Sequence, residues 1–185
     1  GGETLDALGM IELNSIAVGV DVADTMLKAG NVRLLNTQPV CPGKYLVLIR
    51  GKVSEVESSV ASGEEAAGFN LVDQFVIPNI HPQVFPALTA TTSIDKLDAV
   101  GIVETFSLAS CVEAADMAVK ASEIELVEIR LGRGLGGKSF VVMNGVVSAV
   151  QNSVDTVEER FGTEGQLVST VVIPSPHQDL PGGIL

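Results

Sequence analysis

The chain has 185 residues, of which 46% are hydrophobic, and its formal net charge is −12. This charge argues against a nucleic-acid partner, because a phosphate backbone would be repelled. The longest apolar runs are strand-sized, as at residues 45–49, so no membrane partner is expected. Two cysteines, Cys41 and Cys111, are too few for a disulfide framework and predict reduced thiols in a cytoplasm.

The two halves of the chain repeat each other. Residues 9–12, Gly-Met-Ile-Glu, return as Gly-Ile-Val-Glu 92 positions later. The offset grows to 94 at Gly43-Lys44 and to 96 at the stretch 76–81, which holds Val-Ile-Pro and a histidine. Small insertions in the second copy explain this drift. A repeat of this length indicates two copies of one structural unit in the chain.

Each copy begins with a short apolar strand, which ends at Glu12 or Glu104. Ser15 and Ser107 follow as expected N-caps of a helix. The apolar positions of this helix recur at helical spacing and predict its buried stripe: Ile16, Val20, Ala23 and Leu27 in the first copy, and Leu108, Val112, Ala115 and Val119 in the second.

Two strands, a second helix and a last strand complete each copy. In the first copy we expect strands at 32–40 and 44–50, a helix with Val53, Val56 and Val60 that ends near Gly68, and a strand at 75–77. In the second copy we expect strands at 124–131 and 138–144, a helix with Val147, Val150 and Val154 that ends near Gly162, and a strand at 171–173.

This order of elements is the split βαβ arrangement of ferredoxin-like domains. We therefore predict an α+β protein with two tandem domains, at 7–88 and 99–181, joined by a Pro- and Thr-containing linker at 86–98. Such sheets carry helices on one face only, so packing between copies and association into a ring are expected. The fold by itself does not specify a function.

Residues 132–139 match the phosphate-loop pattern G-x-x-x-x-G-K-[ST] and also contain G-x-G-x-x-G. Both motifs bind phosphate only where the loop opens a helix, whose N-terminal amides face the ligand. Here Ser139 is followed by Phe-Val-Val-Met, which favours a strand. The first copy has Val40-Cys41-Pro42-Gly43-Lys44 at the equivalent place. The loop is therefore interpreted as part of the repeat, and a nucleotide site is rejected.

No catalytic group is expected elsewhere, and the chain is predicted not to be an enzyme. The two histidines, His81 and His177, occupy equivalent positions after equivalent strands, which favours a structural role. Glu12 and Glu104 are equivalent as well, and a strand-edge or subunit contact suits them better than acid–base catalysis.

Several stretches together resemble the bacterial microcompartment (BMC) shell domain, in both copies and over nearly the whole chain. They are Ala7 to Glu12, the Ala23-Asp24…Lys28-Ala29 helix with its partner Ala115-Asp116…Lys120-Ala121, the glycine-rich loops between strands, and the Val-Ile-Pro-x-x-His endings at 76–81 and 172–177. Two such domains in one chain resemble the tandem class, in which three chains form a pseudohexamer. The resemblance implies a homotrimer that assembles with other shell proteins in the shell of a microcompartment, within the cytoplasm.

The resemblance also assigns roles to individual residues. It places the loop between the second and third strands at the centre of the ring, so that the pore is lined by Cys41, Pro42 and Gly43 from the first copy and by Arg133, Gly134 and Leu135 from the second. Lys28 and Lys120 match the lysine through which family hexamers meet edge to edge.

Residues 39–44 look like the cysteine loop of the T-type shell proteins of propanediol-utilisation compartments, trimers that hold an iron–sulfur cluster on their axis. The resemblance implies that Cys41 is a metal ligand in one 4Fe-4S cluster per trimer, because three thiolates can hold such a cluster with one iron left to an outside ligand. Electrons or clusters would then cross the shell, with encapsulated redox enzymes as further partners. Cys111, among Ala109, Ser110 and Val112 on a predicted helix, is expected to be a buried, inert thiol.

Two alternatives remain open at this point. A shell protein with a metal-free pore would conduct a small metabolite, and an unrelated ferredoxin-like regulator would bind a small ligand between its repeats. A monomer or dimer in solution would favour the regulator.

Overall fold

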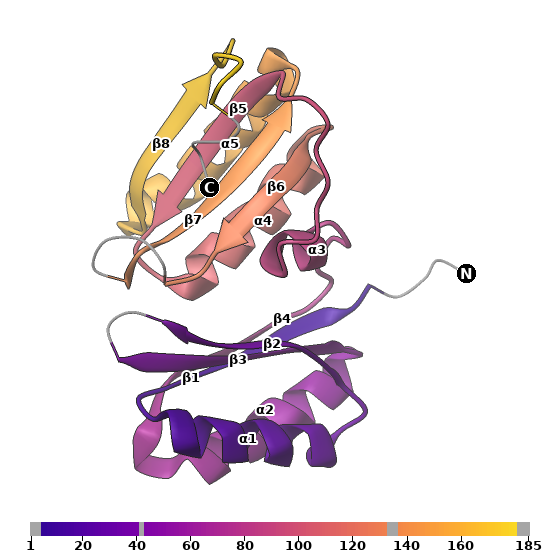
Figure 1. Cartoon of the computed structure of the whole chain (residues 1–185), viewed down its shortest axis with the longest axis vertical. Helices are drawn as coiled ribbons and strands as arrows, with labels where there is room; N and C mark the ends of the chain where they lie inside the picture. The colour runs from indigo at the N-terminus through magenta and orange to yellow at the C-terminus, as the bar shows by residue number, and fades with distance from the viewer. Residues whose placement is uncertain (1–4, 41–42, 133–136, 181–185) are drawn as a thin grey trace. The chain divides into compact units, whose positions relative to one another are not determined.

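The computed structural model describes residues 5–40, 43–132 and 137–180, which divide into two compact units, Gly1–Pro82 and Gln83–Leu185. Each unit holds one copy of the repeat, and the colour in Figure 1 runs continuously from indigo at the start of the first unit to yellow at the end of the second. The division after Pro82 lies ahead of the predicted end of the first copy at residue 88, because residues 83–88 pack on the second unit.

The first unit is a four-stranded antiparallel sheet with two long helices on one face (Figure 1). Its elements are β1 (Ala7–Leu13), α1 (Ile16–Ala29), β2 (Arg33–Val40), β3 (Lys44–Gly51), α2 (Val53–Ala67), the short 3-10 helix η1 (Gly68–Asn70) and β4 (Leu71–Ile77). The strand order is β2-β3-β1-β4, with β1 central and β2 at an edge. This order confirms the predicted ferredoxin-like arrangement.

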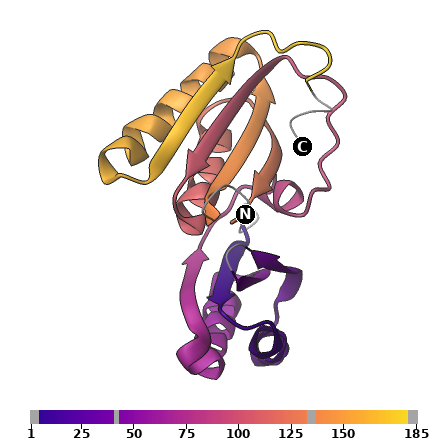
Figure 2. The ribbon, with the colours of Figure 1, turned by 60° about the vertical axis from the view of Figure 1, so that its left-hand side comes forward.

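The second unit repeats this architecture. It comprises α3 (Val84–Leu88), β5 (Ala99–Thr105), α4 (Leu108–Ala121), β6 (Glu125–Arg130), β7 (Ser139–Gly145), α5 (Val147–Phe161), η3 (Gly162–Glu164) and β8 (Leu167–Ile173). The strand order is β6-β7-β5-β8, and Figure 2 shows α4 and α5 on one side of this sheet. The five-residue helix α3 was not predicted, because its residues were assigned to the end of the first copy and the linker.

The helix ends follow the local sequence signals. Ser15 and Ser107 are extended N-caps whose hydroxyl oxygens accept hydrogen bonds from Val18 N and Ser110 N, as predicted. The second helices end before Gly68 and Gly162, also as predicted. Gly68 has a φ of +52°, a conformation that glycine adopts more easily than other residues.

The second helix lies close to the central strand in both units. A Cβ on Gly9 would lie 2.7 Å from Val56 Cγ1, and one on Gly101 would lie 2.8 Å from Val150 Cγ1. Glycine at this point of β1 and β5 therefore allows α2 and α5 to approach the sheet. The helices are also joined to each other, since Ser59 and Ser153 donate buried hydrogen bonds to the carbonyls of Met26 and Ala118. No helix in the described part of the chain is long and apolar enough to cross a membrane.

The predicted buried stripe is correct for α4 and largely wrong for α1. In α4, Leu108, Val112, Ala115 and Val119 are all buried. In α1 the core residues are Gly19, Val22, Ala23 and Met26, whereas Ile16, Val20 and Leu27 are exposed by 62%, 57% and 40%. The side of α1 that packs in the core combines the small residues Gly19 and Ala23 with Val22 and Met26, so large apolar residues occur on both sides of the helix.

Candidate functional site

Three residues, 41–43, connect β2 to β3. Val40, the last residue of β2, is buried and pairs with Lys44, the first residue of β3, so that residues 41–43 form the connection. Gly43 has a φ of +61°, and a Cβ there would meet nothing within 4 Å. The predicted pore residues Cys41 and Pro42 lie outside the described residues.

The loop between β6 and β7 is longer than the loop between β2 and β3. It likewise follows the edge strand of its sheet. Arg130 pairs with Phe140, and Gly132 and Gly137 both have positive φ. Gly132 N donates a 2.9 Å hydrogen bond to the buried hydroxyl of Ser139, which closes the base of the loop. The predicted pore residues Arg133, Gly134 and Leu135 lie outside the described residues.

The position of Ser139 confirms that the phosphate-loop pattern does not open a helix. Ser139 is the first residue of β7, and the next helix, α5, begins only at Val147. The residues that follow the motif form a strand, so they provide no helix N-terminus to bind a phosphate. The Ser139 hydroxyl accepts a bond from the loop backbone, so it contributes to the hairpin itself.

Each hairpin carries a lysine at its base. Lys44 Nζ lies 3.2 Å from Glu12 Oε1, and the Glu12 side chain is 9% exposed. Lys138 Nζ lies 5.9 Å from the centre of the Phe106 ring, a cation–π contact. The Glu12 carboxylate is thus neutralised by a neighbouring ammonium group on the adjacent strand, which suits a structural role better than proton transfer.

Cys111 is buried and poorly suited to bind a metal. Its side chain is fully inaccessible in α4, and this burial raises the pKa of its thiol to about 12, with a hydrogen bond to Thr105 acting in the opposite direction. Metal ligation requires a thiolate. The prediction that Cys111 is buried is confirmed. The prediction that its thiol is inert stays a prediction.

Lys28 and Lys120 occupy equivalent places in the last turns of α1 and α4. Their Nζ atoms lie 2.6 Å from Asp24 and 2.7 Å from Asp116, one turn earlier in each helix. The hydrogen bond and the charge of Asp24 raise the pKa of Lys28. The Lys28 side chain is 75% exposed and that of Lys120 is 42% exposed, so both amines are accessible on the surface.

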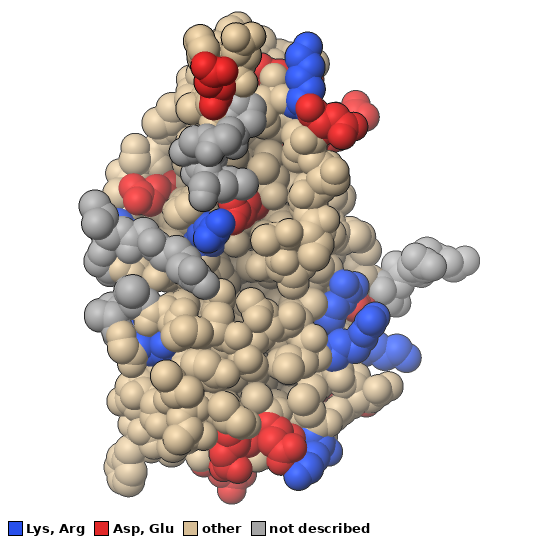
Figure 3. Space-filling view, in the orientation of Figure 1, with Lys and Arg blue, Asp and Glu red and all other residues tan. Residues whose placement is uncertain are grey.

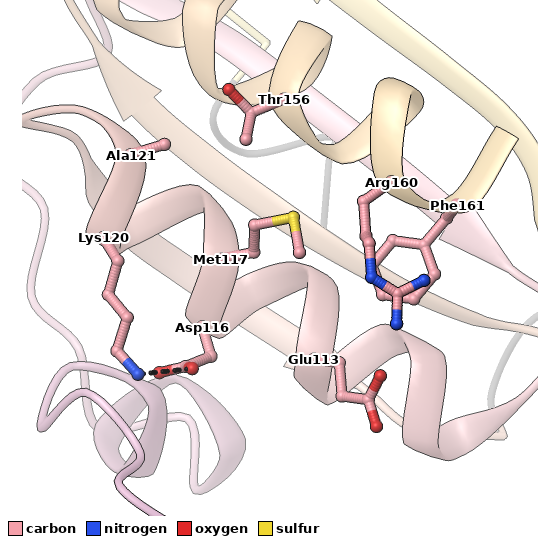
Figure 4. Close-up of a pocket in the computed structure, with 8 residues that line it drawn as sticks. All are labelled: Glu113, Asp116, Met117, Lys120, Ala121, Thr156, Arg160 and Phe161. Carbon is pink, nitrogen blue, oxygen red and sulfur yellow. Dashed lines mark hydrogen bonds and ion pairs between the residues drawn. The ribbon is translucent and has the colours of Figure 1, made fainter.

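A shallow pocket of about 450 Å³ lies beside Lys120, between α4 and α5. Figure 4 shows Lys120 paired with Asp116 at one end and Arg160 over the Phe161 ring at the other. It is lined by Glu113, Asp116, Met117, Lys120, Ala121, Thr156, Arg160 and Phe161. Glu113 is the remaining charged residue of the lining, so the pocket carries charges of both signs.

The remaining sequence candidates do not assemble into a reactive site. Among the described residues, no group of three or more His, Cys, Asp or Glu side chains is placed to hold a metal ion. His177 is 73% exposed, and its Nδ1 accepts a hydrogen bond from Asp179 N in a local turn. On the face drawn in Figure 3 the basic residues lie in separate small groups beside acidic ones.

One set of interacting residues was not predicted from the sequence: the segment that follows β4. The side chain of Gln83 accepts a 3.0 Å hydrogen bond from Leu126 N, on edge strand β6, and donates a 3.5 Å bond to the carbonyl of Ile124, just before that strand. Val84 and Phe85 beside it are buried. The apolar residues just after Pro82 were the available signal, because a solvated linker would not need them.

Comparison with known proteins identifies both units. A family model described as the BMC domain matches residues 7–80 and 99–176. A curated relative from Citrobacter freundii, the bacterial microcompartment shell protein PduT, is 48% identical over 94% of this chain and 95% of its own length. The carboxysome shell protein CsoS1A of Hydrogenovibrio crunogenus is 38% identical over 45% of this chain and 90% of its own length. A single-domain relative thus matches one copy of the repeat.

A solved structure has the same fold over the whole chain. The crystal structure of a microcompartment protein from Desulfitobacterium hafniense DCB aligns with a TM-score of 0.92 and 49% identity. The alignment covers 96% of this chain and 99% of that chain. Agreement over both units at this identity matches the tandem organisation as well as the fold of each copy.

Proposed function

The chain belongs to the BMC domain family of microcompartment shell proteins, and on that basis we propose that three copies form a ring whose axis carries one 4Fe-4S cluster bound by three Cys41 thiolates. The chain is then a structural shell subunit that also transfers electrons, or exchanges clusters, across the shell. The observation that carries this proposal is the contrast between the two cysteines, since only Cys41 remains for metal binding.

The donor set fits such a cluster. Iron–sulfur centres are held by thiolates, and Cys111 is excluded by its burial and its high pKa. One chain therefore supplies a single ligand, and three symmetry-related chains supply three. The described residues that flank the cysteine are held in place, since Val40 is buried and Lys44 is paired with Glu12.

A bound cluster would supply one-electron redox chemistry, with one iron open to water or a small ligand. The chain's own contribution is to orient the thiolates and to place positive charge near them. Lys44 follows the loop directly, and Arg133 occupies the equivalent loop of the second copy. Hydrogen-bond donors and cations near the sulfur atoms stabilise the more reduced, more negative state of such a centre.

Other shell proteins are the proposed partners at the outer edge, through Lys28 and Lys120. Both ammonium groups are accessible, and each forms an ion pair with an aspartate one helical turn earlier. Encapsulated redox enzymes are the proposed partners for electrons or clusters.

The proposal is tested by anaerobic reconstitution with iron and sulfide of the wild type, Cys41→Ser and Cys111→Ala. Alanine is the matched control because Cys111 is fully buried in α4, where a serine would place a hydroxyl group in the core. We expect iron–sulfur absorption and bound iron in the wild type and in Cys111→Ala, and neither in Cys41→Ser.

Two other results would each replace the proposal. Equal iron content in all three proteins, or none in the wild type, would leave Cys41 as a pore-lining thiol and favour a pore for a small metabolite. A stable monomer or dimer at micromolar concentration would remove the axial site altogether and favour a ligand-binding regulator.

A further inference from the structure

The first unit has a basic end, at the point where β2 begins. Arg33, the first residue of β2, lies directly opposite Arg50 on β3, and Lys52 comes directly after β3. Arg33 and Lys52 are exposed and form no ion pair within the described residues. Like charges directly opposite each other destabilise a sheet, so an acidic partner would be favourable here. We call Arg33, Arg50 and Lys52 the β2/β3 end, and Figure 3 shows a group of basic side chains at this end of the unit.

The equivalent end of the second unit is acidic and apolar. Glu125, the first residue of β6, lies directly opposite Asn144 on β7, so these two residues occupy the places of the two arginines. Val146 comes directly after β7, in the place of Lys52, and is 62% exposed. Glu123, just before β6, is exposed as well. We call Glu123, Glu125 and Val146 the β6/β7 end.

The backbone is arranged in the same way at both ends, so their charges can be compared position by position. A Cβ on Gly51 would lie 3.3 Å from Asn31 O, and one on Gly145 would lie 3.5 Å from Glu123 O. The residues that lead into β2 or β6 therefore lie against the end of β3 or β7 in both units. A neutral residue, Asn31, thus stands in the first unit where the second has an acid.

One acid that both ends share is neutralised in the first unit only. Asp6 lies 2.9 Å from Arg50 in an ion pair. Its counterpart Asp98 is exposed, and Asn144 Oδ1 accepts a 2.8 Å hydrogen bond from the Asp98 backbone N. No ion pair involves the Asp98 carboxylate in the described part of the chain. The β6/β7 end therefore has negative charge beside it that the β2/β3 end lacks.

The other charges near these ends offset one another. Lys28 and Lys120 are each paired with an aspartate one helical turn earlier. Near the β6/β7 end, where Asn144 Nδ2 donates to the carbonyl of Lys96, the exposed side chains of Asp95 and Lys96 are adjacent in sequence and opposite in charge. The excess charge thus comes from two basic residues at one end and three acidic residues at the other: Arg33 and Lys52, and Asp98, Glu123 and Glu125.

We propose that the β2/β3 end of each chain binds the β6/β7 end of a chain in another trimer, so that unlike ends meet where trimers join. This inference rests on the trimer and the shell edge of the proposed function, and it identifies which edge meets which. Opposite charges attract across this contact, whereas two β2/β3 ends, or two β6/β7 ends, would place like charges side by side. Each trimer carries three ends of each kind, so the contact repeats into a layer of trimers.

Exposed valines at the β6/β7 end add an apolar component to this contact. Val146 and Val147, at the start of α5, are exposed by 62% and 47%. The aliphatic part of a lysine side chain can cover apolar surface while its ammonium group reaches a carboxylate. Lys52 of another chain can therefore lie over the two valines and pair with Glu123 or Glu125.

The test reverses the charge of each end in the full-length chain, separately and together. Arg33→Glu/Lys52→Glu makes both ends acidic, and Glu123→Lys/Glu125→Lys makes both ends basic. Each of these variants should form layers only at a concentration about tenfold or more above that of the wild type, because like charges then meet. The chain with all four substitutions should recover most of this loss, because unlike ends meet again with their charges exchanged. Light scattering at low ionic strength and electron microscopy measure the layers.

Glu64→Lys/Glu65→Lys is the matched control. Both acids are exposed in the last turn of α2, far along the helix from the β2/β3 end, and their reversal changes the net charge as much as that of Glu123 and Glu125. Layers of this variant should form as those of the wild type do. Sedimentation velocity in dilute solution should show trimers for every variant.

Four results would each overturn the inference. The reversed variants could form layers as readily as the wild type, or lose the trimer itself. The chain with all four substitutions could assemble no better than the weaker of the two reversed variants. Wild-type trimers could form no layers with one another, which would leave other shell proteins as the partners of both ends. The proposed function survives all of these results, whereas a monomeric wild type would remove its ring as well.

Discussion

At the scale of single residues, the two cysteines divide between core and loop. Cys111 has no accessible surface, and its burial raises the pKa of the thiol from about 9 to about 12. Its neighbours Ala109 and Val112 predicted this burial from sequence, since small apolar residues on a helix indicate a packed face. The role of Cys41 came from the resemblance of its loop to a known family, because a single cysteine has no distinguishing pattern of its own.

The raised pKa predicts how the two thiols react. At pH 8 the native protein without metal should react quickly with one equivalent of a thiol reagent, at Cys41, and with two equivalents in denaturant. Cys41→Ser should show almost no native reaction. Two rapid equivalents in the native wild type would show that Cys111 is accessible.

The same shift predicts a dependence of stability on pH. The folded state keeps the Cys111 thiol neutral, so this group contributes fully to stability below about pH 9 and progressively less as the pH rises towards 12. Cys111→Ala should therefore lose less stability than the wild type over that interval, measured by denaturant unfolding at each pH.

At the scale of elements, the order of strands and helices could be predicted from the sequence, whereas the buried side of α1 could not. Caps at Ser15 and Ser107 and glycines after α2 and α5 are local signals, and the structure confirms them. An apolar stripe on a helix predicts a buried side, but it does not indicate whether the same chain or another chain buries it. In α1 the most hydrophobic stripe is exposed, and the smaller residues Gly19 and Ala23 face the sheet.

The close approach of α2 to β1 gives a prediction at this scale. Gly9→Ala would place a Cβ 2.7 Å from Val56 Cγ1 and 2.8 Å from Val60 Cγ2. Relief of this overlap requires the helix to move, so we expect a loss of about 1–3 kcal/mol in the free energy of unfolding. Urea denaturation followed by circular dichroism would measure it.

Gly162→Ala is the matched control for this substitution. Gly162 has a helical φ of −61°, and an added Cβ would meet nothing within 4 Å. Alanine there should change the free energy of unfolding by less than about 1 kcal/mol, with a slight gain from the stiffer unfolded chain. Equal losses at both positions would mean that the packing of α2 on β1 is looser than described.

At the scale of the whole molecule, duplication explains both the similarity and the differences between the units. The sequence repeat predicted two domains, and the family model matches both of them. The division after Pro82 was not predicted, because the segment that packs on the second unit directly follows the last strand of the first copy. Sequence periodicity locates the copies but does not indicate which copy a connecting segment packs against.

Assembly beyond the ring should depend on the paired lysines. Lys28→Ala and Lys120→Ala should impair the formation of sheets or shells and leave the trimer intact, because both amines are exposed at equivalent helix ends. Electron microscopy would follow the sheets, and light scattering the trimer. Loss of the trimer in either variant would mean that these lysines belong to the ring contact.

The central claim is that three chains together bind one cluster through Cys41. Native mass spectrometry of anaerobically reconstituted protein measures the number of chains and the bound mass in one experiment. We expect a species of three chains with one four-iron, four-sulfide cluster, and a bare trimer for Cys41→Ser. A bare wild-type trimer, or a cluster that remains bound in Cys41→Ser, would contradict it.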